Sequence, residues 1–94
     1  MVASIDSPER ALETPVVYPN PSVHGELSIQ WTSRQAGPVD VEVLDLTGKV
    51  IFRHQHVGKL GTQFLQLTPE VGAGLHLVRL TQGSAQRTVK WLVH

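Results

Sequence analysis

The chain has 94 residues, no cysteine, and a formal net charge of zero from eight basic and eight acidic residues. This length provides for one domain with one modest core, because a small domain buries roughly 60% of its unfolded surface. The balanced charge argues against nucleic acid as a partner, and the lack of thiols excludes disulfides and thiolate chemistry. No apolar run approaches the roughly 20 residues that cross a bilayer, so we expect no direct membrane insertion.

Residues 1–15 mix Ser, Pro, Glu, Arg and Ala without a strand period. Their stretch DSPERALE could form a capped helical turn, but it is too short to be stable alone. The start of the chain also lacks the basic and apolar regions of an export signal. We therefore predict a flexible linker at 1–15, preceded by another part of a longer protein, and a folded domain at 16–94.

Two prolines, Pro19 and Pro21, flank Asn20 where strand-like sequence begins. Each proline restricts its own φ, lacks a backbone donor and favours extended geometry in the preceding residue. Such a segment can end a first strand at a sheet edge and protect that edge from pairing. In this interpretation Tyr18 anchors the linker to the domain.

From residue 16 onward, short alternating runs between turn residues predict antiparallel strands. Leu27, Ile29 and Trp31 alternate with polar residues and define the buried face of one strand. Two further runs are joined by DLTG, where Asp45 can accept hydrogen bonds from the turn backbone and Gly48 can adopt positive φ. This combination predicts a tight hairpin.

Three more runs follow at residues 62–67, 75–82 and 87–93, and a tight turn around Gly83 and Ser84 joins the last two. The total is seven strands, with no connection long enough for a crossover helix. We predict an all-β fold, an Ig-like antiparallel β-sandwich of about seven strands. A small closed barrel is the alternative.

An ordered set of motifs adds a family resemblance. VYPNP is followed by VLDLTGKVI, then by LTPEVGAGLHLVRLTQG and a last strand that contains Lys90. Over residues 16–94 this set resembles the type A C-terminal sorting domain of type IX secretion cargo. The positions that match the motifs are Tyr18, Pro19, Asn20, Pro21, Asp45, Gly48 and Gly74. His76 departs from the pattern, because the family usually has an aromatic or bulky apolar residue there.

The resemblance implies a sorting function without catalysis or a cofactor. Such proteins enter the periplasm of Bacteroidota-type bacteria and cross the outer membrane through the type IX translocon, to the cell surface or the medium. The implied partners are translocon shuttle proteins, a cell-surface sortase that removes the domain, and an N-terminal cargo domain. Cleavage is expected within residues 1–15, where a protease needs an accessible chain.

The last strand is the predicted recognition element. A signal that is read after translation must stay reachable, and a strand with a lysine among apolar residues can pair with a partner's groove or sheet edge. We expect partner recognition by Lys90, Trp91, Leu92, Val93 and His94. The alternative for Lys90 is an ordinary solvated position, and Gly48 and Gly74 are interpreted as backbone devices.

Two further pairs of residues are candidates for metal binding or catalysis. His54 and His56 share a strand face and could begin a zinc or copper site, but no acidic residue at short spacing completes it, so we expect surface histidines and no metal. Asp40 and Glu42 share an outer strand face, where we expect solvated charges that discourage edge pairing. No nucleophile elbow is present, and we expect no enzymatic activity.

Five aromatic residues raise the alternative of a non-catalytic Ig-like adhesive or carbohydrate-binding accessory module: Tyr18, Trp31, Phe52, Phe64 and Trp91. Stacking on sugars needs exposed rings. Both tryptophans continue apolar strand faces, however, and we expect them in the core.

Overall fold

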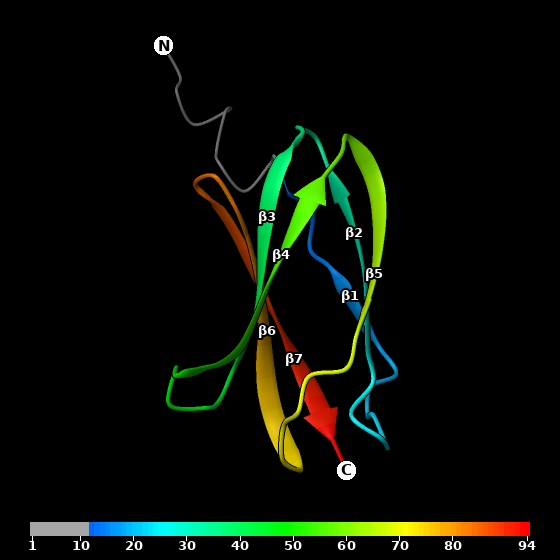
Figure 1. Ribbon diagram of the computed structural model, residues 1–94, viewed down its shortest axis with the longest axis vertical. Helices are drawn as coiled ribbons and strands as arrows, with labels where there is room; N and C mark the ends of the chain where they lie inside the picture. Colours follow the sequence, from blue (N-terminus) through cyan, green and yellow to red (C-terminus); the bar gives the residue numbers. More distant parts are fainter. Residues whose placement is uncertain (1–11) are drawn as a thin grey trace.

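The computed structural model describes residues 12–94, and the structural statements below concern these residues. Seven strands follow one another along the chain (Figure 1). They are β1 (Val16–Tyr18), β2 (Leu27–Ser33), β3 (Gly37–Leu44), β4 (Val50–Gly58), β5 (Gly61–Leu67), β6 (Gly74–Gln82) and β7 (Ala85–Val93). No helix occurs within 12–94, so the predicted all-β fold is confirmed.

The strands form two antiparallel sheets that pack as a sandwich. One sheet has the order β1-β2-β5 and the other has the order β4-β3-β6-β7. The chain changes sheets between β2 and β3, between β4 and β5, and again between β5 and β6 (Figure 1). Because the sheets remain separate, the structure is the predicted sandwich and not a closed barrel.

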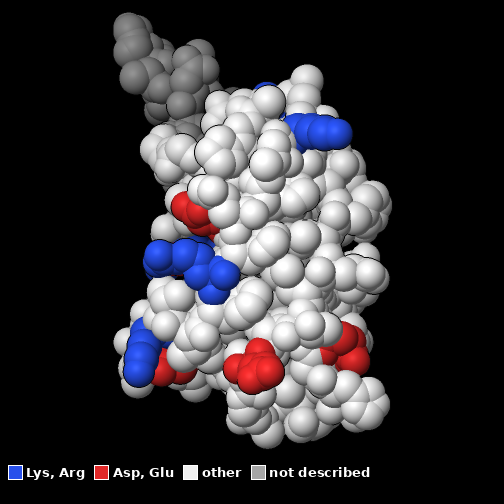
Figure 2. All heavy atoms as spheres, in the orientation of Figure 1, with Lys and Arg blue, Asp and Glu red and all other residues white. Residues whose placement is uncertain are grey.

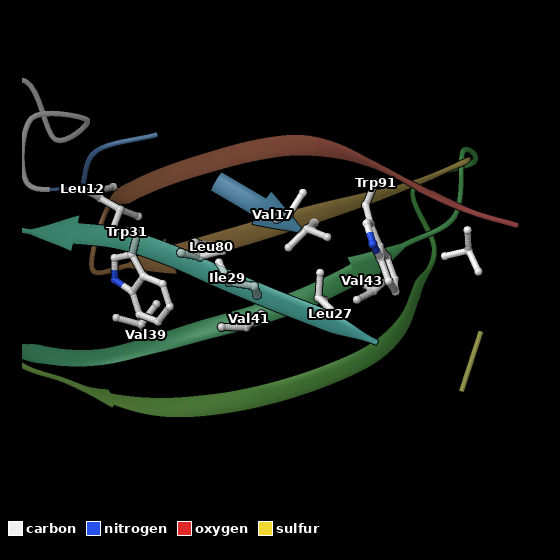
Figure 3. Packing of buried hydrophobic residues seen from close by; sticks show 13 residues of the cluster. Leu12, Val17, Leu27, Ile29, Trp31, Val39, Val41, Val43, Leu80 and Trp91 are labelled. Carbon is white, nitrogen blue, oxygen red and sulfur yellow. The ribbon is translucent and has the colours of Figure 1, made fainter. Parts of the chain in front are cut away.

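The core lies between the sheets and is made by alternate residues of the strands (Figure 3). Strand β2 contributes Leu27, Ile29 and Trp31 in the predicted pattern, and β3, β6 and β7 face them from the other sheet. Trp31 and Trp91 are both buried, as predicted. These two indoles are the largest fully buried side chains, so they contribute strongly to the hydrophobic stabilisation.

Leu12 also belongs to this core, although it precedes the predicted domain boundary. It forms a bridge with Ser33, and the Glu13 N–H donates to the Thr32 carbonyl at 3.0 Å. Pro15 is buried as well. Residues 12–15 of the expected linker are therefore attached to the domain, whereas the remaining part, 1–11, lies outside the described residues.

The first strand is at the edge of its sheet and ends before Pro19, as the proline argument predicts. The prediction that Tyr18 anchors this part of the chain to the domain was wrong. Tyr18 is 42% exposed on the outer face, whereas Val17 is only 9% exposed and packs in the core. Because successive side chains of a strand point to opposite faces, Val17 and Tyr18 cannot both face the core.

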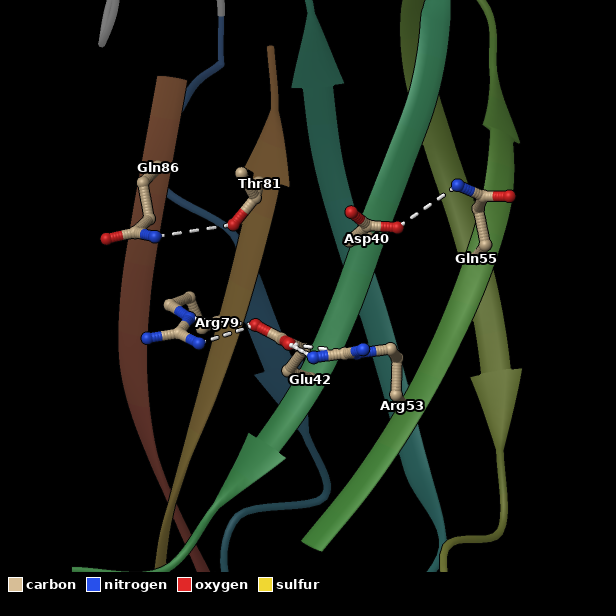
Figure 4. A network of polar contacts seen from close by, with 7 residues as sticks. All are labelled: Asp40, Glu42, Arg53, Gln55, Arg79, Thr81 and Gln86. Atoms are coloured by element: carbon tan, nitrogen blue, oxygen red, sulfur yellow. Dashed lines mark hydrogen bonds and ion pairs between the residues drawn. The ribbon is translucent and has the colours of Figure 1, made fainter. Parts of the chain in front are cut away.

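Glu42 is not the solvated edge charge that its sequence pattern predicts. Strand β3 lies between β4 and β6, and Glu42 is only 6% exposed. Its carboxylate accepts two hydrogen bonds from Arg53, at 2.7 and 3.0 Å, and two from Arg79, at 2.7 and 2.9 Å (Figure 4). Burial alone would raise the pKa of Glu42, but the bonds from Arg79 and Arg53 outweigh it and the pKa lies below its ordinary value.

Candidate recognition site

The turn before β4 has the predicted chemistry. The Asp45 carboxylate accepts hydrogen bonds from the N–H groups of Thr47 (2.9 Å) and Lys49 (3.0 Å), and Gly48 has a φ of 90°. The hydroxyl of Thr47 also donates to Asp45, and these bonds lower the pKa of the carboxyl. Gly74 begins β6 with a φ of 126°, so both motif glycines occupy conformations that disfavour a side chain.

The segment 19–22, here called the clasp, lies along the free side of β7. The Asn20 side chain donates from Nδ2 to the Lys90 carbonyl at 3.0 Å, and its Oδ1 accepts from the Leu92 N–H at 2.9 Å. One side-chain amide thus satisfies two backbone groups that a neighbouring strand would otherwise satisfy.

Backbone pairing extends the clasp to the end of β7. The Ser22 N–H donates to the Leu92 carbonyl, and the His94 N–H donates to the Ser22 carbonyl, each at 2.8 Å. The Trp91 indole Nε1 donates to the Pro19 carbonyl at 3.3 Å. The expected pairing of residues 90–94 with a partner's sheet edge therefore meets backbone groups that are already bonded within the domain.

Ser22 is held in place from the other side. It is fully buried, and its hydroxyl donates to the Glu26 carboxylate at 2.9 Å. This bond lowers the pKa of Glu26. The connection between β1 and β2 is thereby fixed against β7.

The five predicted recognition residues separate onto two faces of β7. Trp91 and Val93 are buried in the core, whereas Lys90 and His94 are exposed and Leu92 is partly buried on the outer face. This division follows from the two-residue period of a strand. Three of the five side chains therefore lie on the outer face of the sheet, and two lie in the core.

Leucines of neighbouring strands border the outward residues of β7. Lys90 lies opposite Leu77 and Leu92 lies opposite Leu75, while Leu77 also lies opposite Leu44 of β3. Sequence reasoning did not find this apolar surface around Lys90. A signal was available, because LHLVRL in β6 has apolar residues at both odd and even positions.

The surface has two other features, a pocket and a sparse distribution of charge. An open pocket of about 630 Å³ lies beside the end of β7, lined by residues 23–25, several residues of 68–73, Val93 and His94. Charged side chains are few on the face shown in Figure 2, and they are scattered among uncharged residues. This face therefore carries no continuous charged surface.

His76 stands at the position where the resemblance implies an aromatic or bulky apolar residue. It is only 6% exposed and packs against Trp91, with ring centroids 5.9 Å apart. Its Nδ1 is buried without a hydrogen-bond partner. The imidazole therefore replaces the aromatic ring in position but leaves one polar atom unsatisfied.

The other candidate histidines do not lie where the sequence predicts. His54 and His56 pair with the inward-facing Val41 and Val39, are partly buried, and are therefore not surface histidines. The His56 ring packs edge-on against Trp31, with centroids 5.3 Å apart. Within residues 12–94, no group of three His, Cys, Asp or Glu residues is placed to hold a metal ion.

The five aromatic residues are also divided. Trp31 and Trp91 are buried, Phe52 is partly buried against the core, and only Tyr18 and Phe64 are more than one-third exposed. The two exposed rings belong to the β1-β2-β5 sheet. A stacking platform for sugars could use only these two residues.

The structure is an all-β domain, and its candidate recognition site is the outer face of β7 together with the neighbouring leucines. The family model described as "Secretion system C-terminal sorting domain" matches residues 16–94. The chain therefore belongs to this family, the C-terminal sorting domain of type IX secretion, which serves as a sorting signal for exported or cell-surface proteins.

The remaining comparisons add no relative. Searches of curated proteins and of solved structures found no match to this chain. Within the described part of the chain, no helix is long and apolar enough to cross a membrane.

Proposed function

We propose that this domain directs a larger cargo protein from the periplasm across the outer membrane through the type IX translocon. Translocon shuttle proteins recognise it, and a cell-surface sortase then removes it from the cargo. Family membership supports the sorting role. The geometry of β7 supports recognition of the signal through side chains on its outer face.

The clasp is the observation that carries this proposal. It joins two parts of the family motif, Asn20 and the segment around Lys90, that are 70 residues apart in the sequence. Because the clasp occupies the backbone of residues 90–94, the partner contacts side chains and not the strand edge. Lys90, Leu92 and His94 make these contacts, while Trp91 and Val93 hold the strand in the core.

The surroundings of Lys90 indicate the chemistry of the contact. An exposed ammonium group beside Leu75, Leu77 and Leu92 fits a partner surface that places an acidic group next to apolar side chains. The leucines bury apolar area against the partner, and the ion pair of Lys90 with the acidic group fixes the orientation of the partner.

We place the sortase cleavage on the N-terminal side of Leu12. Leu12 is fully buried and Glu13 is hydrogen bonded to Thr32, so a cut at these residues would require part of the domain to unfold. A protease acts on chain that can enter its active site in an extended form.

The proposal is tested by fusing residues 1–94 behind an export signal and a reporter, in strains with and without a working translocon. We compare Lys90→Ala with Lys59→Ala, because both lysines are exposed but Lys59 lies in the turn between β4 and β5. We expect export of the parent and of K59A only in the competent strain, with loss of export in K90A. Undiminished export of folded K90A would contradict the role of Lys90.

Point variants are preferable to deletion of residues 90–94 for this test. Deletion is also expected to abolish export, but it removes Trp91 and Val93 from the core and so confuses recognition with folding. Circular dichroism of each variant establishes that the fold is retained.

A second candidate function is that of a carbohydrate-binding accessory module. It is favoured by exposed Tyr18 and Phe64 on a sheet whose strands carry no charged residue. Calorimetric titration of the wild type and Phe64→Ala with neutral glycans tests it. Glycan binding that requires Phe64, together with export that does not depend on the translocon, would favour this function over sorting.

A further inference from the structure

Strand β5 presents an unprotected edge. It is the last strand of the β1-β2-β5 sheet, and within residues 12–94 no strand pairs with its outer side. Its sequence, GTQFLQL, contains neither a charged residue nor proline. Natural edge strands usually carry charges, prolines or bulges that prevent pairing with another chain, and β5 lacks the first two of these devices.

The direction of the β5 backbone groups follows from the hydrogen bond on the opposite side of β2. The Thr32 carbonyl accepts from Glu13 and therefore points toward the β1 side of the sheet. Since backbone direction alternates along a strand, Ser33 and Trp31 point toward β5 and pair with Gly61 and Gln63.

The complementary set of β5 residues consequently points outward. The same alternation directs the N–H and C=O groups of Thr62, Phe64 and Gln66 away from β2. They form a row of donors and acceptors at strand spacing, and the Phe64 side chain beside them is 64% exposed.

The other described edges are less suited to pairing. The clasp occupies β7 between Lys90 and His94. Strand β4 carries exposed Arg53, and β1 has only three residues before Pro19.

The start of β5 is also held in a defined geometry. The buried Gln63 side chain accepts from the Lys59 N–H at 3.0 Å and donates to the carbonyls of Lys59 (2.6 Å) and Gly61 (2.9 Å). These bonds fix the turn between β4 and β5. An edge that is already ordered loses little conformational entropy when it pairs.

We propose that β5 pairs antiparallel with β5 of a second copy of this chain, about a twofold axis at Phe64. In this register Phe64 faces its own counterpart, and Thr62 faces Gln66 of the second copy. The three outward residues of each strand supply about six backbone hydrogen bonds, and the two phenyl rings form a cross-strand aromatic pair.

A second copy is a suitable occupant because this pairing is self-complementary. No like charges meet across the axis, since β5 has no charged residue. The pairing joins two three-stranded sheets into one six-stranded sheet. A single strand edge buries little area, so we expect dissociation constants in the micromolar to millimolar range. This association is independent of the proposed sorting function.

Sedimentation velocity of residues 1–94 tests the association between about 10 µM and about 1 mM, the range expected for a small interface. We expect the wild type to shift from monomer to dimer and Phe64→Lys to remain monomeric. Leu46→Lys is the matched control, because Leu46 is also 64% exposed but lies in the turn before β4. A monomeric wild type throughout, or an associating F64K, would overturn the proposal.

A charge-swap experiment tests the register. Phe64→Lys and Phe64→Glu should each be monomeric alone, because like charges face each other across the axis. An equimolar mixture should form a heterodimer, because the opposite charges then pair. If the mixture remains monomeric although the wild type dimerises, the twofold pairing at Phe64 is wrong.

Hydrogen exchange provides an independent measurement on the wild type. At high protein concentration, the amides of Thr62, Phe64 and Gln66 should gain protection, while those of Gln63 and Leu65 should change little because they already face β2. Protection that appears elsewhere, for example along β4, would show association through a different surface and would also overturn the proposal.

Discussion

The free side of β7 and the free side of β5 are edges of the same small sandwich, yet one is closed and the other is open. Asn20 and Ser22 bond the backbone of the end of β7 and of His94, which follows it, whereas no described segment pairs with the outer side of β5. An edge is closed by any segment that places donors and acceptors at strand spacing, and a single asparagine side chain provides part of this.

The two edges therefore offer a partner different kinds of contact, side chains at β7 and backbone groups at β5. At the closed edge, a partner meets side chains such as Lys90 and Leu92. At the open edge, a partner meets backbone groups, which pair with little regard to sequence. We therefore propose that sequence-specific recognition uses the surface of β7 and that self-association uses the edge of β5.

The largest expected effect is removal of the core beneath the closed edge. Trp91→Ala should lower the free energy of unfolding by about 3–5 kcal/mol, because it leaves a cavity beside His76 and removes the bond to Pro19. Urea denaturation followed by circular dichroism measures this. Trp91→Phe retains most of the ring and should lose clearly less; equal losses in the two variants would contradict the packing described.

Removal of the Glu42 carboxylate, which bonds to Arg53 of β4 and Arg79 of β6, is expected to have the next largest effect on stability. Glu42→Gln should cost about 1–2 kcal/mol, because it removes charge-assisted bonds to Arg79 and Arg53, and exposure of Arg53 limits the loss. Asp40→Asn is the matched control on the same strand. Its carboxylate accepts one bond from Gln55 at 3.2 Å, and its loss should be smaller.

The pH dependence of stability gives a separate prediction for Glu42. Its pKa in the folded state is below the ordinary value of 4.5, so on acidification the unfolded chain binds the proton first. The stabilisation is therefore complete above about pH 4.5 and is lost as pH falls through the folded-state pKa. Urea titrations across this range should show a shallower loss in E42Q; identical profiles would contradict this assignment.

The two edges are compared directly by Asn20→Ala and Gln66→Ala. The first removes two hydrogen bonds to β7 and should cost about 1–2 kcal/mol. The second alters an exposed side chain at the open edge and should change stability by less than about 0.5 kcal/mol. Hydrogen exchange at the Leu92 amide should accelerate only in N20A, and unchanged exchange there would mean that the clasp does not close β7.

The last substitution is expected to stabilise the domain, unlike those above. His76→Phe should stabilise the domain by about 1 kcal/mol, because it removes the unpartnered buried Nδ1 while keeping an aromatic ring beside Trp91. Thermal unfolding measures the gain. A destabilised variant would indicate that this part of the core cannot accommodate the larger ring.

The amino-acid sequence by itself determined the features that depend on neighbouring residues. The two-residue period of Leu27, Ile29 and Trp31 predicted a strand and its buried face, and the Asp45–Gly48 spacing predicted the turn. These predictions succeed because strand alternation and turn hydrogen bonds involve residues only a few positions apart. The family motifs extended this information to the fold as a whole.

Only the tertiary structure decided which strand lies beside which. It buried Glu42 between two arginines, added Leu12 to the core, turned His54 and His56 inward, and placed Asn20 against β7. Several of these contacts join residues that are far apart in the chain, including Glu42 with Arg79 and Asn20 with Leu92. A local pattern of polar and apolar residues carries no information on such pairs, because the order of strands in the sheets brings them together.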